Sequence, residues 1–75
     1  MVAKVAPMHI TINGHTQEIP CGSSLACALA LFSPYGDEAC VVRLNGAVYK
    51  SIDALDDITL HADDIIEIYP LVIGG

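Results

Sequence analysis

The sequence of 75 residues has few aromatic side chains and no tryptophan. Its four aromatic residues are Phe32, Tyr35, Tyr49 and Tyr69. Aliphatic side chains must therefore supply most of the core, and a hydrophobic content of 53% is sufficient for a core to form. At this length we expect one domain that buries about 60% of the surface of its unfolded chain.

Basic residues are also scarce, with three Lys and Arg against nine Asp and Glu, which gives a formal net charge of −6. A surface of this charge repels phosphate groups, so we expect neither nucleic acid nor a membrane as a partner. A basic protein is the better candidate. No run approaches the roughly 20 apolar residues of a membrane span. The opening MVAKVAP lacks the apolar stretch of a signal peptide, so we expect a cytosolic protein.

The cysteines Cys21, Cys27 and Cys40 form no CxxC pair, whereas a structural zinc ion needs about four ligands at closer spacing. The histidines stand apart from them in the sequence. We therefore expect no bound metal or cofactor, and reduced cysteines that serve as small apolar residues. The serines, cysteines and histidines form no recognisable nucleophile–base set, which makes a small enzyme the least favoured class.

An alternation of apolar and polar residues predicts the strands of a sheet. The stretch MHITINGHTQEI, residues 8–19, alternates in this way and contains Asn13-Gly14. This dipeptide favours a tight turn with positive φ at both central residues, so we expect an antiparallel hairpin. A second hairpin is expected around Asn45-Gly46, from strands at 41–45 and 48–50.

One helix is expected between the two hairpins, over 25–32, because Ser23 and Ser24 can cap its first turn. Four apolar residues at helical spacing predict the face that packs on the sheet: Leu25, Ala28, Leu29 and Phe32. The other face carries no charge and consists of Ala26, Cys27, Ala30 and Leu31. We expect this face either to be simply exposed or to be covered by Val2 and Val5, or by a second copy of the protein.

A last strand is expected at 65–69, after a polar connection over 51–64. The apolar anchors predicted in that connection are Ile52, Leu55, Ile58 and Leu60. In the strand, Ile66 and Ile68 face the core, and the outward residues are Ile65, Glu67 and Tyr69. We also expect Arg43 to lie beside Glu67 on the outer face of the sheet, with Tyr69 on the same face, where the three would shape a surface for a partner.

The order of these elements predicts an α+β fold, a β-grasp or ubiquitin-like roll. Its mixed sheet has about four to five strands with one main helix packed across it, and the last strand lies between the first and the third. The domain is expected to span 8–69. Residues 1–7 precede it as an extension, and residues 70–75 follow it as a flexible tail.

The tail holds the residues with the clearest functional pattern. Pro70 has no amide hydrogen, so the regular sheet should fail there, and the six residues from Pro70 to Gly75 can extend about 20 Å. Gly74 and Gly75 lack Cβ atoms and can enter a narrow slot that leaves the terminal carboxylate open to activation. Three branched residues precede them, and each can contribute about 1.5–3 kcal/mol in a partner's groove: Leu71, Val72 and Ile73.

With these features the sequence resembles the ubiquitin-like sulfur carriers, a family that includes the thiamin-pathway carrier and the small subunit of molybdopterin synthase. The resemblance covers about 8–75 and is carried by ITINGHTQEIPCGSSL, RLNG and ADDIIEIYPLVIGG. In that family an activating enzyme consumes ATP to adenylate the last glycine, which then becomes a thiocarboxylate and donates sulfur. The resemblance implies that Gly75 carries the sulfur, that Gly74 provides access, and that the chain has no catalytic residues.

The resemblance also implies three partners: an adenylyltransferase of the ubiquitin-activating type, a sulfur-donating enzyme and a sulfur-accepting synthase such as thiazole synthase. The first half favours thiamin thiazole synthesis. The ending is similar to carriers for molybdopterin and tRNA thiolation, so these pathways stay open, as does cysteine or homocysteine synthesis. A ubiquitin-like modifier shares the activation step, and a plain interaction module shares the fold. Residues 1–7 and the uncharged helix depart from the family pattern.

Overall fold

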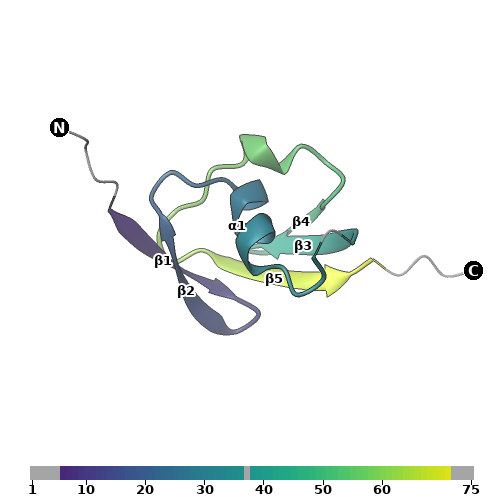
Figure 1. The fold of residues 1–75 in the computed structure, drawn as a ribbon, viewed down its shortest axis with the longest axis horizontal. Coiled ribbons are helices and arrows are strands. Elements are labelled where there is room, and N and C mark those ends of the chain that lie inside the picture. The colour runs from purple at the N-terminus through teal and green to yellow at the C-terminus, as the bar shows by residue number, and fades with distance from the viewer. Residues whose placement is uncertain (1–5, 37, 72–75) are drawn as a thin grey trace, which may run out of the picture.

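The structure is a computed structural model that describes residues 6–36 and 38–71. Its elements, in chain order, are β1 (Pro7–Ile12), β2 (His15–Pro20), α1 (Leu25–Phe32), β3 (Cys40–Leu44), β4 (Ala47–Lys50), the 3₁₀ helix η1 (Leu55–Asp57) and β5 (Ile65–Pro70). They form an α+β fold, as expected, in which one five-stranded sheet has the order β2-β1-β5-β3-β4 (Figure 1). The last strand lies between the first and the third, which confirms the predicted arrangement.

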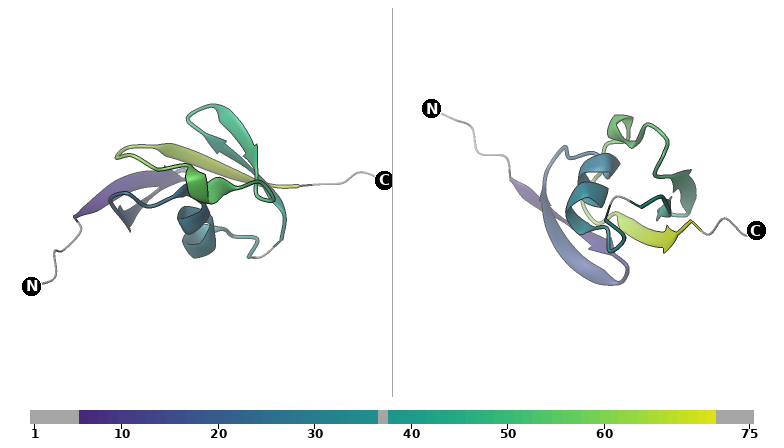
Figure 2. Two further views of the ribbon diagram at one scale, coloured as in Figure 1. Left: turned by 90° about the horizontal axis from the view of Figure 1, so that it is seen from above. Right: turned by 45° about the vertical axis from the view of Figure 1, so that its right-hand side comes forward.

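The sheet is mixed, and α1 packs on one of its two faces. β5 runs parallel to β1 and antiparallel to β3, while the two hairpins are antiparallel. Figure 2 shows α1 on one side of the sheet, with no other helix of the described residues over the opposite side. No helix in residues 6–36 and 38–71 has both the length and the apolar character needed to cross a bilayer.

Both Asn-Gly pairs adopt the predicted turn conformation. The φ angles are 49° and 82° at Asn13 and Gly14, and 49° and 94° at Asn45 and Gly46. Positive φ at both positions matches the twist of the two strands that the turn joins, and Asn tolerates it better than most residues with a Cβ. The two hairpins therefore close with the register that the sequence pattern predicts.

The side chains of the two turn asparagines also bind the central strand, which turn chemistry alone did not predict. Oδ1 of Asn13 accepts a hydrogen bond of 2.8 Å from the amide of Ile68. Oδ1 of Asn45 accepts one of 2.8 Å from the amide of Ile65, and its Nδ2 donates to Asp64 Oδ1 at 2.9 Å. These bonds tie each hairpin to β5. They also give the amides of Ile65 and Ile68 a hydrogen-bond acceptor.

Helix α1 has the predicted bounds, and Ser24 is its cap. Ser24 Oγ accepts a hydrogen bond of 3.1 Å from the amide of Cys27, which satisfies one of the free donors of the first turn. The hydroxyl of Ser23 instead donates to the carbonyl of Pro20 at 2.6 Å, so Ser23 closes the preceding turn.

The helix face turned away from the sheet is partly covered, so the expected division into two faces is only half right. Ala30 and Leu31 are exposed, but Ala26 and Cys27 are half-buried and pack against the core. The connection between β4 and β5 runs beside the start of the helix, where the amide of Leu25 donates to the carbonyl of Ile58 at 2.8 Å. Val2 and Val5, expected as a cover, lie outside the described residues.

The core between α1 and the sheet is aliphatic, as expected. Its buried residues are Met8, Ile10, Ile12, Ile19, Leu25, Ala28, Cys40, Val42, Leu55, Leu60, Ile66 and Ile68. Ile52 was wrongly predicted as an anchor, since 74% of it is exposed. The amide of Asp53 donates to the carbonyl of Lys50 at 2.9 Å and closes a turn that places Ile52 on its outside.

The strands extend beyond the predicted limits at both ends of the domain. β1 begins at Pro7 rather than Met8, and the amide of Cys21 donates to the carbonyl of Ala6 at 3.0 Å. At the other end, β5 continues to Pro70 rather than stopping at Tyr69. The folded region is therefore wider than the range 8–69 expected from the alternation alone.

Candidate functional site at the end of β5

β5 crosses the middle of the sheet and ends at the opposite end of the molecule from the start of β1 (Figure 1). β1 pairs with the first two residues of β5, through Thr11 and Ile12, and β3 pairs with residues 66–70. The last described residue, Leu71, is half-buried. Within the described residues, the end of β5 is thus held by β3.

The expectation that the sheet fails at Pro70 is wrong. Pro70 pairs with Cys40, and the amide of Leu71 still donates to the carbonyl of Ala39 at 3.3 Å. In an antiparallel pair, alternate residues direct their amides to a given neighbour. Because the Leu71 amide faces β3, the missing amide of Pro70 falls on the β1 side, where β1 has already ended at Ile12, and no ladder bond is lost.

Of the residues predicted to act in the tail, only Leu71 is described. Val72, Ile73, Gly74 and Gly75 lie outside the described residues, so their predicted roles stay predictions. Leu71 itself is not a free apolar contact, because its backbone is bonded to β3 and its side chain is half-buried.

The three partner-binding residues predicted on the sheet lie together beside the end of β5. Arg43 is directly opposite Glu67 in the β3–β5 ladder, and Arg43 Nη1 is 3.7 Å from Glu67 Oε1. The hydroxyl of Tyr69 donates to the other carboxylate oxygen, Oε2, at 2.5 Å. Glu67 therefore joins the other two side chains, and the predicted outer-face arrangement is confirmed.

The Glu67 carboxylate determines the electrostatics of this group. The hydrogen bond to Glu67 raises the pKa of Tyr69 above its usual 10.0; desolvation and the negative charge of Glu67 act in the same direction, and the positive charge of Arg43 opposes them. Tyr69 is therefore a protonated donor near neutral pH. The Arg43–Glu67 pair is 49% and 40% exposed, and such pairs contribute only about 0.2–1 kcal/mol to stability.

Exposed aliphatic side chains lie on the same face of the sheet. The register places Val48 opposite Arg43, and Ile65 precedes Glu67 by two residues on β5. Val48 is 62% and Ile65 is 54% exposed. We call the surface formed by the following residues the outer face: Arg43, Val48, Ile65, Glu67 and Tyr69. The sequence analysis placed Ile65 outward but named neither aliphatic residue as partner-binding, although the same alternation that buries Ile66 exposes both.

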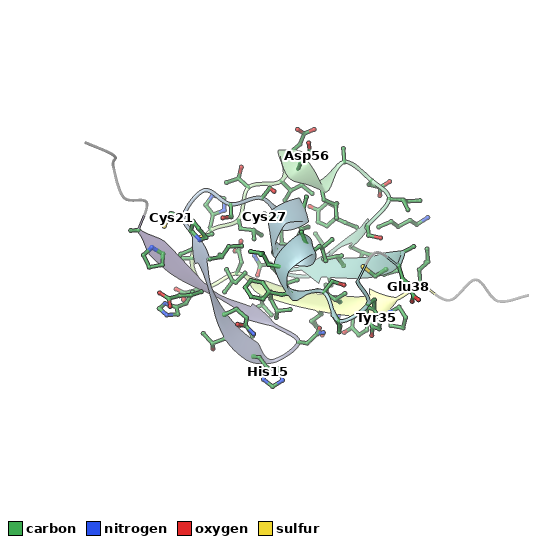
Figure 3. The ribbon with its side chains drawn as sticks, viewed as in Figure 1. His15, Cys21, Cys27, Tyr35, Glu38 and Asp56 are labelled. Carbon is green, nitrogen blue, oxygen red and sulfur yellow. The ribbon has the colours of Figure 1, made fainter. Side chains whose placement is uncertain are left out.

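Metal-ligating side chains do not form a cluster in the described residues. Figure 3 shows His15 at the β1–β2 turn, away from Cys21 and Cys27, which lie before and on α1. Among residues 6–36 and 38–71, no three His, Cys, Asp or Glu side chains are grouped as a metal site requires. Cys40 is buried like a small apolar residue, as expected, whereas Cys21 is exposed, so that expectation is wrong for Cys21.

The candidate site thus combines a strand end that is paired with β3 and a mixed polar and aliphatic surface beside it. No protein-family model, no curated protein and no solved structure matches this chain.

Proposed function

We propose that the protein is a sulfur carrier with a β-grasp, ubiquitin-like fold. A partner enzyme adenylates Gly75 at the expense of ATP, and the adenylate is then converted to a thiocarboxylate that donates sulfur in biosynthesis. The observation that carries the proposal is the course of β5, a central strand paired with β1 at its start and with β3 to its end, which leads through Pro70 and Leu71 into the sequence Gly74-Gly75.

The position of β5 supports this role for a physical reason. A chain end that must enter another enzyme's active site works best when its root cannot move, and the last bond of β5 fixes the root at Leu71. The four residues beyond it span at most about 14 Å when extended, so a partner that takes Gly75 must approach the end of β5 closely.

The outer face is suited to that approach. The outer face extends over β3, β4 and β5, and β5 leads to the tail. It combines exposed Val48 and Ile65 with the Arg43–Glu67–Tyr69 group. In this proposal the adenylyltransferase binds the outer face and accepts residues 72–75 in a groove. A sulfur-donating enzyme and a sulfur-accepting synthase then use the same carrier, and the cytosolic location expected from the sequence is part of the proposal.

The acceptor that we propose is the synthase of the thiamin thiazole. Carriers for molybdopterin, tRNA thiolation, and cysteine or homocysteine synthesis share the same chemistry on the carrier, as does the activation step of a ubiquitin-like modifier. A modifier differs in its product, because Gly75 would then appear in an isopeptide bond to a lysine of another protein rather than as a free thiocarboxylate.

The direct test is the intact mass of the protein after co-expression with an activating enzyme and a sulfur source. We expect a species heavier by the difference between one sulfur and one oxygen atom, with the change located in the C-terminal peptide. Treatment with an alkylating reagent should modify this species at its C-terminus. A protein that stays unmodified with activating enzymes of each candidate pathway would contradict the proposal.

Charge reversal at Glu67 tests the role of the outer face. Glu67→Lys removes the ion pair with Arg43 and the acceptor of Tyr69, so binding to the activating enzyme should weaken markedly. Exposed pairs contribute about 0.2–1 kcal/mol, so the melting temperature should fall by no more than about 4–8 °C. Glu18→Lys, on the edge strand β2, is the matched control and should bind normally. Loss of stability without loss of binding would show that the group serves the fold alone.

A further inference from the structure

The strand β2 forms one edge of the sheet, and part of its backbone faces outward. In an antiparallel pair, alternate residues direct their amides to the neighbouring strand. The amide of Cys21 donates to the carbonyl of Ala6 across the β1–β2 hairpin, so the odd-numbered residues of β2 face β1. The amides and carbonyls of Thr16 and Glu18 therefore face the opposite side, where the sheet of the described residues has no further strand.

The other edge strand, β4, is less open. The amide of Ser51 donates to the carbonyl of Cys40, and by the same alternation Val48 and Lys50 face outward. The amide of Lys50 donates to Asp53 Oδ2 at 3.3 Å, and its carbonyl accepts a hydrogen bond of 2.9 Å from the amide of Asp53. The turn after β4 thus occupies the backbone of Lys50, and Val48 is left as the outward residue of this fully described strand.

The open part of β2 has the features of a template for another strand. All six residues of β2 pair with β1 in an unbroken register, so the outward groups are evenly spaced. Proteins usually protect such an edge with lysine or with a bulge, and β2 contains neither. Pro20 ends the open part, because it has no amide hydrogen and its carbonyl already accepts hydrogen bonds from the amide and the hydroxyl of Ser23.

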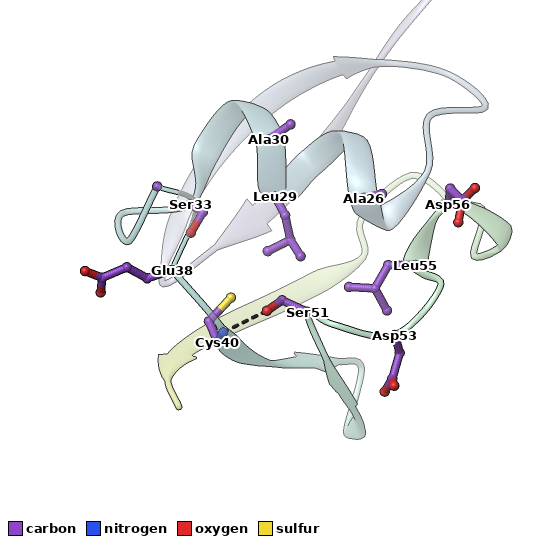
Figure 4. Close-up of a pocket in the computed structure, with 11 residues that line it drawn as sticks. Ala26, Leu29, Ala30, Ser33, Glu38, Cys40, Ser51, Asp53, Leu55 and Asp56 are labelled. Carbon is purple, nitrogen blue, oxygen red and sulfur yellow. Dashed lines mark hydrogen bonds between the residues drawn. The ribbon is translucent and has the colours of Figure 1, made fainter. Parts of the chain in front are cut away.

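An exposed apolar side chain of α1 lies on the flank of the helix that faces β2. The two hairpins lie on opposite sides of α1 (Figure 1). On the β3 side, Ala30 lines a pocket above Cys40 (Figure 4). Leu31 is about 100° further round the helix, and the buried Leu25 and Ala28 occupy the face between the two flanks. Leu31 therefore lies on the β2 side, where it is 60% exposed.

The two sides of the sheet at β2 differ in character. Gln17 lies on the helix side with the buried Ile19, so a residue paired with Gln17 would point toward the flank that carries Leu31. Residues paired with Thr16 and Glu18 would point to the other side, where Glu18 is exposed. An apolar residue suits the first position, and a basic residue suits the position opposite Glu18. A second copy is a poor complement, because β2 has no Lys or Arg and each chain has a net charge of −6.

We propose that β2 binds an extended segment of another protein, which adds a strand to the sheet antiparallel to β2. The segment exchanges backbone hydrogen bonds with Thr16 and Glu18, places an apolar side chain near Leu31, and places a basic side chain opposite Glu18. β1 separates β2 from β5, so the outer face stays free and two proteins can be held at once. The proposal does not depend on the sulfur chemistry of the tail.

The test is an NMR titration of the full-length protein with the capped peptide acetyl-Val-Lys-Leu-Lys-Val-amide. The amide signals of Thr16 and Glu18 should shift, and their exchange with solvent should slow. The amide of Val48, which faces outward at the other edge, should not change. Equal shifts at Val48, or none at Thr16 and Glu18, would overturn the proposal. So would signals of Thr16 and Glu18 that depend on protein concentration without peptide, because a second copy would then be the occupant.

Methylated peptides separate strand pairing from other contacts. In the proposed register the amides of both peptide lysines face β2, whereas those of the leucine and the last valine face away. N-methylation of both lysine amides should abolish binding, and N-methylation of the leucine and last valine amides should weaken it less than about threefold. Replacing the peptide leucine by serine should weaken binding about fivefold. Equal losses in the two methylated peptides would overturn the proposal.

Variants of the protein test the same contacts from the other side. Thr16→Pro removes an outward amide at a position where an edge strand accepts proline, and should weaken binding about tenfold or more. Thr16→Ala keeps the amide and should change affinity less than about twofold. Leu31→Ser should weaken binding about threefold or more, and Ala30→Ser, on the other flank of α1, less than about twofold. Full binding by Thr16→Pro, or equal effects of the two helix variants, would overturn the proposal.

Discussion

Deletion of Gly74 and Gly75 is expected to abolish sulfur loading while leaving the fold intact. In the proposed mechanism the terminal carboxylate enters a narrow slot that a bulky last residue blocks, and the shortened chain would end on the β-branched Ile73. All the core residues and β5 ladder bonds that the structure describes lie at or before Leu71, so we expect the free energy of unfolding to change by less than about 0.5 kcal/mol. Intact mass after co-expression measures loading, and thermal unfolding measures stability.

Substitutions at Gly75 provide the control for this deletion. Gly75→Ala adds one methyl group and should slow loading, whereas Gly75→Trp should block it, and neither should alter the melting temperature. A truncated chain that still accepts sulfur would refute the sulfur-carrier proposal. A normal loading rate in Gly75→Trp would show that the end of the chain does not enter a narrow slot.

Of the variants proposed, Ile66→Ala is expected to lower the free energy of unfolding the most. Ile66 is 0% exposed in the central strand, and truncation of such a residue costs about 2–5 kcal/mol through lost burial and the cavity left behind. A domain of this length has a total stability of about 4–11 kcal/mol, so the loss is a large fraction of it. Chemical denaturation should show the change as a lower midpoint with an unchanged slope.

The neighbouring residue supplies a matched control. Ile65→Ala removes the same atoms from a side chain that is 54% exposed on the outer face, and should cost less than about 1 kcal/mol. If the outer face binds the activating enzyme, Ile65→Ala should weaken that binding although it barely changes stability. Similar losses of stability in the two variants would contradict the assignment of Ile66 to the core and Ile65 to the surface.

Features that depend on neighbours in the chain were predictable from the sequence. The positive φ angles at Asn13 and Asn45 follow from the chemistry of Asn-Gly, and the bounds of α1 follow from its cap and its helical spacing. The inward position of Ile66 and the outward position of Glu67 follow from the period of a strand. Because these properties are local, single residues and their spacing were enough to determine them.

Features that depend on which elements become neighbours were decided by the tertiary structure. Pro70 is accepted in β5 because its missing amide faces the side where β1 has ended, and the residue type alone does not indicate that side. Asn13 bonds to β5 only because the sheet order brings its hairpin there, and Ile52 is exposed because the turn closed by Asp53 directs it outward.

Among the surfaces of the molecule, too, one could be predicted from the sequence and another depended on the tertiary structure. The pairing of Arg43 with Glu67 was predictable, because strand alternation and the expected strand order place both on one face of adjacent strands. The pocket above Cys40 was not, because its walls come from α1, η1 and two loops that are distant in the sequence. A strand pattern specifies which side of a sheet a residue occupies, whereas a cavity depends on how separate segments pack, and only the folded chain determines that packing.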